Sequence, residues 1–383
     1  MFMKKFWKSN QKAIKFIIEV FFVWQAVIFL ISFFASRQFP ARERFMYNDG
    51  KEIVNPIFLW DRANFDGIHY LLISRGGYGL YQQAFFPLYP KLIQSLRPVF
   101  GGKDLLAAVF VSNISLFAYL ILLYKLACLD YSESIAQKTI IFFLVFPTSF
   151  FGGMVYTEAL FLMLLLGSFY AARKDKWLVA GILGGLASYT RLIGVFIFPA
   201  LVWEWWQGRR MRGEKWEVEK LAETLLVPLG LLVYMKFLWR KWNDPLMFIH
   251  VQPLFGAERS NNIILIYQVF WRYFKMILTT KLDPLYFAVW LELLSAVSFI
   301  VLLFLAFKKG MRISYLIFAA FSFFIPALTG TFSSLPRYVL VMFPCFILMG
   351  VIKDKIVCKI LWISFSLLFI ISSIFFFRGY WIA

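Results

Sequence analysis

Residues 285–307 read LYFAVWLELLSAVSFIVLLFLAF, and Lys308 and Lys309 follow directly. Glu292 is the one charged residue in this stretch. About 20 apolar residues are enough to cross a hydrocarbon core of roughly 30 Å as a helix. A helix is the expected conformation, because backbone groups inside lipid must satisfy their own hydrogen bonds. The stretch therefore predicts a membrane-spanning helix.

The composition of the whole chain agrees with this prediction. Of 383 residues, 61% are hydrophobic and 16% are charged, whereas an ordinary soluble domain has about 45–50% apolar and about 25% charged residues. The net charge of +19 does not indicate a nucleic-acid-binding domain, since no long polar segment exists to form a soluble basic surface. The three cysteines have no metal-ligand spacing and are expected to fill apolar space.

Similar apolar stretches recur along the chain, and the first is longer than the core of a signal peptide. We therefore predict an all-α polytopic membrane protein with ten or eleven transmembrane helices, forming a single domain over residues 1–383. The expected spans are 14–35, 105–126, 138–151, 157–172, 177–189, 191–206, 221–240, 285–307, 313–330, 338–352 and 356–377.

The basic residues of the short connections predict the orientation. With a cytoplasmic N-terminus, the basic clusters at 173–176, 209–212, 308–312 and 353–359 all fall inside, as the positive-inside rule requires. Two long segments, about 36–104 and about 241–284, then lie outside. Residues 263–278 of the second segment are amphipathic and are expected to form either an interfacial helix or a further span.

The densest polar cluster lies in the first outer segment and contains Asp66 and His69. On a helix, residues three apart share a face, so a carboxylate and an imidazole can converge on one substrate group. This arrangement suits general-base chemistry at a hydroxyl. The alternative is a solvated loop in which the two side chains make only a local contact.

The sequence around this cluster resembles the first luminal loop of the PIG-V type mannosyltransferases, the GPI mannosyltransferase 2 family and its prokaryotic relatives. The resemblance extends from about residue 60 to 345, through motifs that occur in the same order. These are FDGIHYLLISRGGY (65–78), AFFPLYP (84–90), FPTSFF (146–151) with YTE (156–158), TRLIG (190–194), NDPLMF (243–248) with Gln252, and PRY (336–338) with Phe343-Pro344.

The resemblance implies a GT-C type glycosyltransferase that takes a sugar, expected to be mannose, from a polyprenyl- or dolichyl-phosphate carrier. In this interpretation Asp66 is the general base, and His69 orients it or binds sugar hydroxyls. Arg191 and Arg337 are candidates for binding the lipid phosphate, since an arginine fork suits phosphate oxygens. The family has Trp-Asp where this chain has Phe65-Asp66. A separate Trp60-Asp61 lies upstream, so Asp61 competes for the catalytic role.

Further substrate-binding candidates follow from the same motifs. Glu158 is expected at the outer end of a span, where a carboxylate is either functional or hydrogen-bonded to a neighbouring helix. Asp244 and His250 line the acceptor cleft or, alternatively, form an ordinary turn. Tyr78 and Tyr338 are the last two substrate-binding candidates. No role is assigned to Glu292. We expect no metal and no cofactor beyond the lipid-phosphate sugar donor.

Two other classes of function remain open from the sequence: a polytopic transporter or lipid flippase, and an inactive scaffold. Transport predicts ionisable residues near the midplane and broken helices, whereas the polar residues here concentrate in an outer loop. The expected partners are the lipid-phosphate donor, a glycolipid or glycan acceptor and membrane lipids, without nucleic acid. The expected location is a prokaryotic plasma membrane, or the endoplasmic reticulum membrane in a eukaryote.

Overall fold

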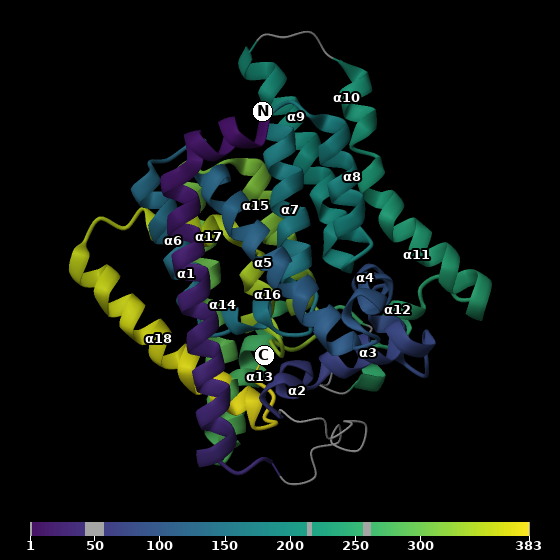
Figure 1. Ribbon diagram of the computed structural model, residues 1–383, viewed down its shortest axis with the longest axis vertical. Coiled ribbons are helices and arrows are strands. Elements are labelled where there is room, and N and C mark those ends of the chain that lie inside the picture. The colour runs from purple at the N-terminus through teal and green to yellow at the C-terminus, as the bar shows by residue number, and fades with distance from the viewer. Residues whose placement is uncertain (1, 43–56, 213–216, 256–261, 383) are drawn as a thin grey trace.

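The computed structural model describes residues 2–42, 57–212, 217–255 and 262–382, and these contain helices and no strands. The all-α prediction is therefore confirmed. Figure 1 shows a bundle with the N-terminus at one end and residues near the C-terminus in the other half. The helices are α1 (Phe2–Gln38), α2 (Ile57–Trp60), α3 (Asp66–Gly76), α4 (Leu88–Leu96), α5 (Asp104–Ala127), α6 (Glu133–Val145), α7 (Glu158–Arg173), α8 (Trp177–Ser188), α9 (Ile197–Arg212), α10 (Val218–Glu223), α11 (Leu226–Trp242), α12 (Met247–His250), α13 (Ile266–Thr279), α14 (Pro284–Lys308), α15 (Ile313–Ala327), α16 (Leu335–Tyr338), α17 (Phe343–Gly350) and α18 (Lys355–Phe377).

Five stretches of the described chain are long and apolar enough to cross a membrane, and each contains a predicted span. They are Gln11–Gln38, Asp104–Ala127, Val218–Trp242, Pro284–Lys308 and Lys355–Phe377, and the shorter apolar helices α8 and α15 match two more predicted spans. The protein is thus a polytopic membrane protein, whereas the total of ten or eleven spans stays a prediction. The amphipathic segment 263–278 contains most of α13, which has 14 residues. A transmembrane helix needs about 17 or more, so the length of α13 favours the interfacial alternative.

Several predicted spans are not continuous α-helices, and 221–240 is one of them, since it is divided between α10 and α11. Helix α6 ends at Val145, because Phe146 is extended before Pro147, as residues preceding proline tend to be. Residues 192–196 form the short 3-10 helix η5 (Leu192–Phe196) before α9. The predicted span 338–352 is wrong as one helix: it is divided among α16, the 3-10 helix η7 (Val339–Val341) and α17, and α17 is fully buried. Irregular backbone is tolerated at membrane depth where protein surrounds it.

Large apolar side chains on several helices point away from the protein. Phe22 on α1, Val233 on α11 and Ile363 on α18 are each more than half exposed, and α11 and α18 lean outward from the bundle in Figure 1. Exposed apolar surfaces of this extent are unusual on soluble monomers. In a membrane protein such side chains face lipid, so they do not have the free-energy cost of apolar surface in water.

Three of the four basic connections predicted to share one side of the membrane meet in the structure, namely those at 173–176, 209–212 and 308–312. Arg173 at the end of α7 pairs with Asp130, and Arg312 before α15 lies 3.5 Å from the same Asp130 carboxylate. Arg312 also pairs with Glu204 of α9 at 2.9 Å. Arg209 of α9 contacts Asp175 in the connection between α7 and α8. The connections therefore form one charged end of the bundle, and its cytoplasmic placement stays a prediction.

Candidate functional site

A cavity of about 1080 Å³ lies between α3, α7, α13, α14 and α16. Five of the predicted site residues line it: Asp66, Glu158, Arg191, Arg337 and Tyr338. They come from three distant parts of the sequence, the first outer segment, the α7 to η5 region and the segment before α17. The fold thus brings half of the sequence-predicted residues into one cavity.

The four charged residues form a continuous chain of ion pairs. Arg337 Nη1 donates to Asp66 Oδ2 at 2.8 Å, and its Nε lies 3.3 Å from Glu158 Oε1. Arg191 Nη1 donates to the same Glu158 oxygen at 2.6 Å. The side chains of Glu158 and Arg337 are 2% and 7% exposed, while that of Asp66 is 26% exposed. Asp66 is therefore the member of the chain most open to a substrate in the cavity.

Local structure explains how Asp66 reaches the cavity. It is the first residue of α3, where the helix dipole favours a carboxylate. The preceding Phe65 has φ of 56°, a left-handed conformation that is uncommon for a bulky residue. Neighbouring Asn64 holds this turn, because its side chain donates to Phe376 O at 3.0 Å and its carbonyl accepts from Tyr156 at 2.8 Å. The strained turn is thus fixed by α18 and by the segment before α7.

Arg191 and Arg337 are held by equally specific local structure. Arg191 is extended between α8 and η5. Gly194 follows it, and a Cβ there would lie 2.5 Å from the Ala187 carbonyl carbon. Only glycine permits this close return of the chain onto α8. Arg337 lies in α16, which begins after Ser334, a residue with φ of 67°.

Aromatic rings surround the Arg337 guanidinium. Its Cζ lies 5.3–5.4 Å from the ring centroids of Phe151, Tyr156, Tyr338 and Trp381. The Arg191 guanidinium lies 5.3 Å from the Tyr338 centroid, so one tyrosine contacts both arginines. Guanidinium groups stack favourably on aromatic faces. The cage compensates for the burial of two cations and fixes their orientation.

His69 lies beside the cavity and is not among its described lining residues. Its ring stacks on Phe85 with centroids 4.9 Å apart, and its Nδ1 is 3.3 Å from Gln82 Nε2. Burial lowers the pKa of His69, and the charge of nearby Asp66 offsets part of this shift. This effect of Asp66 on His69 agrees with the expectation that the two side chains lie close together. Phe85 does line the cavity, so His69 packs against a residue of the cavity wall.

The remaining predicted residues also lie outside the described lining. Asp61 is buried, at 4% exposure, in the turn before Asn64. Tyr78 donates to Phe85 O at 2.8 Å and packs against Tyr234. Asp244 and His250 form a pair at 2.8 Å on a partly exposed surface. These positions favour Asp66 over Asp61 as the carboxylate that meets a substrate, while the roles of all ten residues stay predictions.

The cavity also contains residues that the sequence motifs did not indicate. Trp381 follows α18 and packs edge to face on Phe65 at 4.9 Å. Tyr273 of α13, Glu292 of α14 and Thr331 form a separate polar group. The signal for Glu292 was its charge inside an apolar span. No comparable signal marked Trp381 or Thr331, since neither belongs to a motif.

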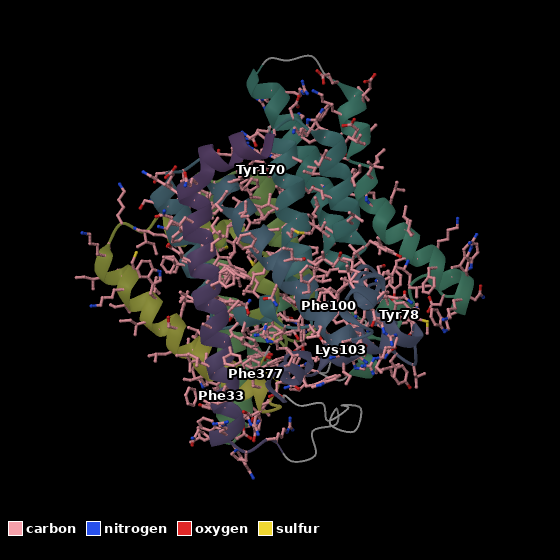
Figure 2. The ribbon with its side chains drawn as sticks, viewed as in Figure 1. Phe33, Tyr78, Phe100, Lys103, Tyr170 and Phe377 are labelled. Atoms are coloured by element: carbon pink, nitrogen blue, oxygen red, sulfur yellow. The ribbon has the colours of Figure 1, made fainter. Side chains whose placement is uncertain are left out.

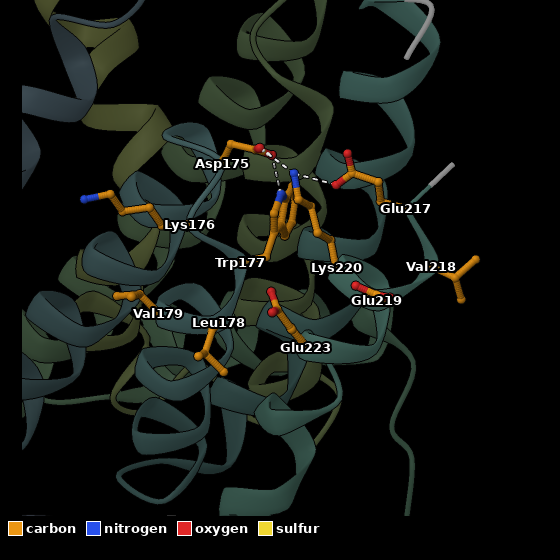
Figure 3. Close-up of a pocket in the computed structure, with 10 residues that line it drawn as sticks. All are labelled: Asp175, Lys176, Trp177, Leu178, Val179, Glu217, Val218, Glu219, Lys220 and Glu223. Atoms are coloured by element: carbon orange, nitrogen blue, oxygen red, sulfur yellow. Dashed lines mark hydrogen bonds and ion pairs between the residues drawn. The ribbon is translucent and has the colours of Figure 1, made fainter. Parts of the chain in front are cut away.

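A second pocket, of about 680 Å³, lies between the α7–α8 connection and α10 (Figure 3). Lys220 bridges Asp175 and Glu217 there, at 2.6 Å from each, and Trp177 donates to Asp175 at 2.7 Å. Asp175 and Glu217 are more than 40% exposed. The pocket belongs to the charged end of the bundle and contains none of the predicted site residues. Within the described ranges, no group of three or more His, Cys, Asp or Glu residues is suited to hold a metal.

Fold and cavity together define a polytopic helical membrane protein with a buried, charge-paired internal site. The family model described as mannosyltransferase (PIG-V) matches residues 11–201. The chain belongs to this family, which confirms the predicted resemblance, and it is a membrane mannosyltransferase. The matched region contains Asp61, Asp66, His69, Glu158 and Arg191, whereas Arg337 lies beyond it. No curated protein matches the chain.

Proposed function

We propose that this mannosyltransferase takes mannose from a polyprenyl- or dolichyl-phosphate carrier and transfers it to a hydroxyl of a lipid-linked or glycan acceptor on the extracytoplasmic or luminal face. The observation that carries the proposal is the 2.8 Å pair between Asp66 and Arg337 inside the cavity. One cavity then offers a carboxylate that can accept a proton and cations that can receive a phosphate. Both groups are needed for transfer from a lipid phosphate.

In the proposed reaction, Asp66 takes the proton from the acceptor hydroxyl. The acceptor oxygen forms a bond to the anomeric carbon while the bond from that carbon to the phosphate oxygen breaks. The lipid phosphate leaves with the electron pair, so a β-linked donor gives an α-linked product. Arg337 holds Asp66 through one oxygen, which keeps the carboxylate oriented for proton transfer.

Arg191 and Arg337 stabilise the leaving phosphate in this mechanism. Arg191 donates Nη1 to Glu158, but a guanidinium carries five N–H donors, so the ion pair does not exhaust its capacity. Negative charge on the phosphate increases as the bond breaks, and fixed cations in a site shielded from water stabilise that charge strongly. Glu158 positions both arginines, because its Oε1 contacts each of them.

The wall of the cavity suits a lipid donor. Apolar lining residues include Leu285, Ile325 and Leu328, which can contact the first isoprene units. The basic connections lie at the other end of the bundle, close to the N-terminus (Figure 1). The positive-inside rule supports a cavity that lies toward the outer face, where lipid-phosphate sugars are the expected donors.

A comparison of donors tests the proposal. Purified protein in nanodiscs is given membrane glycolipid extract with either polyprenyl-phosphate [³H]mannose or GDP-[³H]mannose. We expect transfer from the lipid donor alone, and release of the label by an α-specific mannosidase. Equal or better transfer from GDP-mannose would overturn the assigned donor, and a product resistant to α-mannosidase but cleaved by β-mannosidase would overturn the inverting mechanism.

A further inference from the structure

A second polar group lines the same cavity, away from the motifs that define the family. Tyr273 of α13 donates its hydroxyl to Glu292 Oε2 at 2.5 Å. The same phenol oxygen accepts from Phe332 N at 3.1 Å and lies 3.3 Å from Thr331 Oγ1. Tyr273, Glu292 and Thr331 all line the cavity. Two helices and the segment before α16 thus meet at the Tyr273 hydroxyl.

The location of Glu292 requires an explanation, because it lies within α14, one of the five stretches suited to cross the membrane. It is 6% exposed. A carboxylate in a membrane-spanning helix is costly, and such residues usually face a cavity and mark a functional site. Burial, followed by the charge of Glu292, raises the pKa of Tyr273. The phenol therefore stays protonated and donates to the carboxylate.

The chemistry of this group differs from that of the ion-pair chain. Arg191 and Arg337 attract a phosphate, whereas a carboxylate repels one. A carboxylate beside a phenol and a threonine hydroxyl instead accepts hydrogen bonds from sugar hydroxyls, which are neutral donors. Pockets of this kind use a few polar groups on an apolar wall to orient a neutral ligand.

We propose that Glu292 and Tyr273 form the acceptor subsite, which binds the hydroxyls of a neutral glycoside and presents one of them to Asp66. The proposal rests on the proposed function in one respect, namely that the arginines of the same cavity bind a lipid phosphate. It assigns the substrate class of the acceptor, a glycoside without a charged group at the sugar that is bound. A negatively charged sugar would be rejected by Glu292.

A positioning role for the same residues predicts a different result. Tyr273 holds the backbone at Phe332, five residues before Arg337. If the group acted only by holding that segment, its loss would disturb Arg337. The reaction would then slow for every substrate, or the KM for the donor would increase. An acceptor subsite instead predicts an increase in the KM for the acceptor alone.

The test uses the full chain in nanodiscs, polyprenyl-phosphate mannose as the donor, and tritiated butyl glycosides of mannose, glucose, galactose and glucosamine (N-acetylated) as acceptor probes. For Glu292→Gln we expect a rise in acceptor KM of about tenfold or more, as for the loss of one charged hydrogen bond, with the donor KM unchanged. Tyr273→Phe keeps the carboxylate and should show a smaller rise. Ser295→Ala, one helical turn further along α14 at a buried position outside the lining, is the matched control and should match wild type.

An unchanged acceptor KM, or a higher donor KM, in Glu292→Gln would overturn the subsite. Equilibrium dialysis of the butyl glycosides without donor separates this result from a failure of the proposed function. If wild type transfers nothing from the lipid donor but binds a glycoside about tenfold more tightly than Glu292→Gln, the subsite stands and the donor assignment falls. Equal binding by both proteins, or no binding of any probe, would overturn the subsite itself.

Discussion

Arg337 connects the two carboxylates of the candidate site and is held by four aromatic rings. A single planar cation makes all of these contacts, since its Nη1 and Nε face different partners. A lysine has the same charge but a single nitrogen, so it cannot contact Asp66 and Glu158 in the same way. The contacts of Asp66, the proposed base, therefore depend on the shape of Arg337 as well as on its charge.

We predict that Arg337→Lys lowers kcat/KM for mannose transfer at least about tenfold, the effect of losing one charge-assisted hydrogen bond. The folded yield should stay near that of wild type, because a buried cation remains. Steady-state transfer with polyprenyl-phosphate mannose measures the change. Arg97→Lys is the control, because Arg97 donates to Gly102 O outside the cavity. An unchanged kcat/KM in Arg337→Lys would show that the guanidinium geometry is not needed.

His69 gives a second prediction, because burial lowers its pKa below the ordinary value of 6.5. The unfolded chain then binds more protons than the folded chain just below that value, so stability falls as the pH decreases through this range. The thermal midpoint of wild type should fall more between about pH 7.5 and about pH 5.5 than that of His69→Gln, which lacks the titrating group. Identical pH dependence in the two proteins would contradict the assignment.

At the residue scale the sequence predicted part of the site. Asp66, Glu158, Arg191 and Arg337 were found from motifs, and the structure places them in one cavity. The pairing of Arg337 with Asp66 joins residues separated by 271 positions, so no local pattern reveals it. Trp381 and Thr331 were missed because their position depends on tertiary packing. The motifs also indicated residues whose side chains lie beside the cavity or at the surface, namely His69, Tyr78, Asp244 and His250.

Among the helices, α8 and α11 pack unusually closely. A Cβ on Gly230 of α11 would lie 1.9 Å from Gly185 O, and one on Gly185 would lie 2.6 Å from Leu226 O. Small residues at such interfaces let helix backbones approach each other in membranes. Helix α8 ends just before Arg191, so this packing supports the side of the cavity that carries the arginine.

We predict that Gly230→Ala separates these helices and lowers stability by about 1–3 kcal/mol or more, the usual effect of overpacking. The thermal midpoint in detergent should fall, and transfer should fall with it as Arg191 shifts. Gly76→Ala at the end of α3 is the matched control, since a Cβ there meets nothing within 4 Å. Equal midpoints for the two variants would show that the close approach of α8 and α11 is not required.

The elements were predictable to the extent that their residues are uniformly apolar. The long spans of α1, α5, α14 and α18 match the expected ranges within a few residues at the apolar core. The failure at 338–352 has a local cause, because Pro344 cannot continue a helix from the preceding turn. A new helix, α17, begins there in a segment that protein buries on all sides. Hydropathy does not distinguish a helix buried in protein from one that faces lipid.

Across the whole molecule, charged connections gather at one end and the cavity lies toward the other. In Figure 2, Tyr170 lies in the half with the charged connections and Lys103 lies in the opposite half. Lys174 follows Tyr170 by one helical turn, and both lysines are exposed. The positive-inside rule predicts that Lys174 faces the cytoplasm and that Lys103 lies outside.

Cysteine labelling tests this orientation. In a variant whose Cys128, Cys345 and Cys358 are replaced, Lys103→Cys should react with an impermeant maleimide on intact cells. Lys174→Cys should react only after the cells are permeabilised. The reverse pattern would place the cavity on the cytoplasmic side and exclude a donor that is available only outside.

The most direct test of the account is single-turnover transfer from polyprenyl-phosphate mannose by wild type, Asp66→Asn and Asp61→Asn in the same nanodiscs. Asparagine keeps the size of the side chain but cannot take a proton. We predict that Asp66→Asn loses transfer by at least about 10²-fold, as for removal of a general base, while Asp61→Asn retains it and both stay folded. Transfer retained by Asp66→Asn would contradict the account, whatever the effect at Asp61.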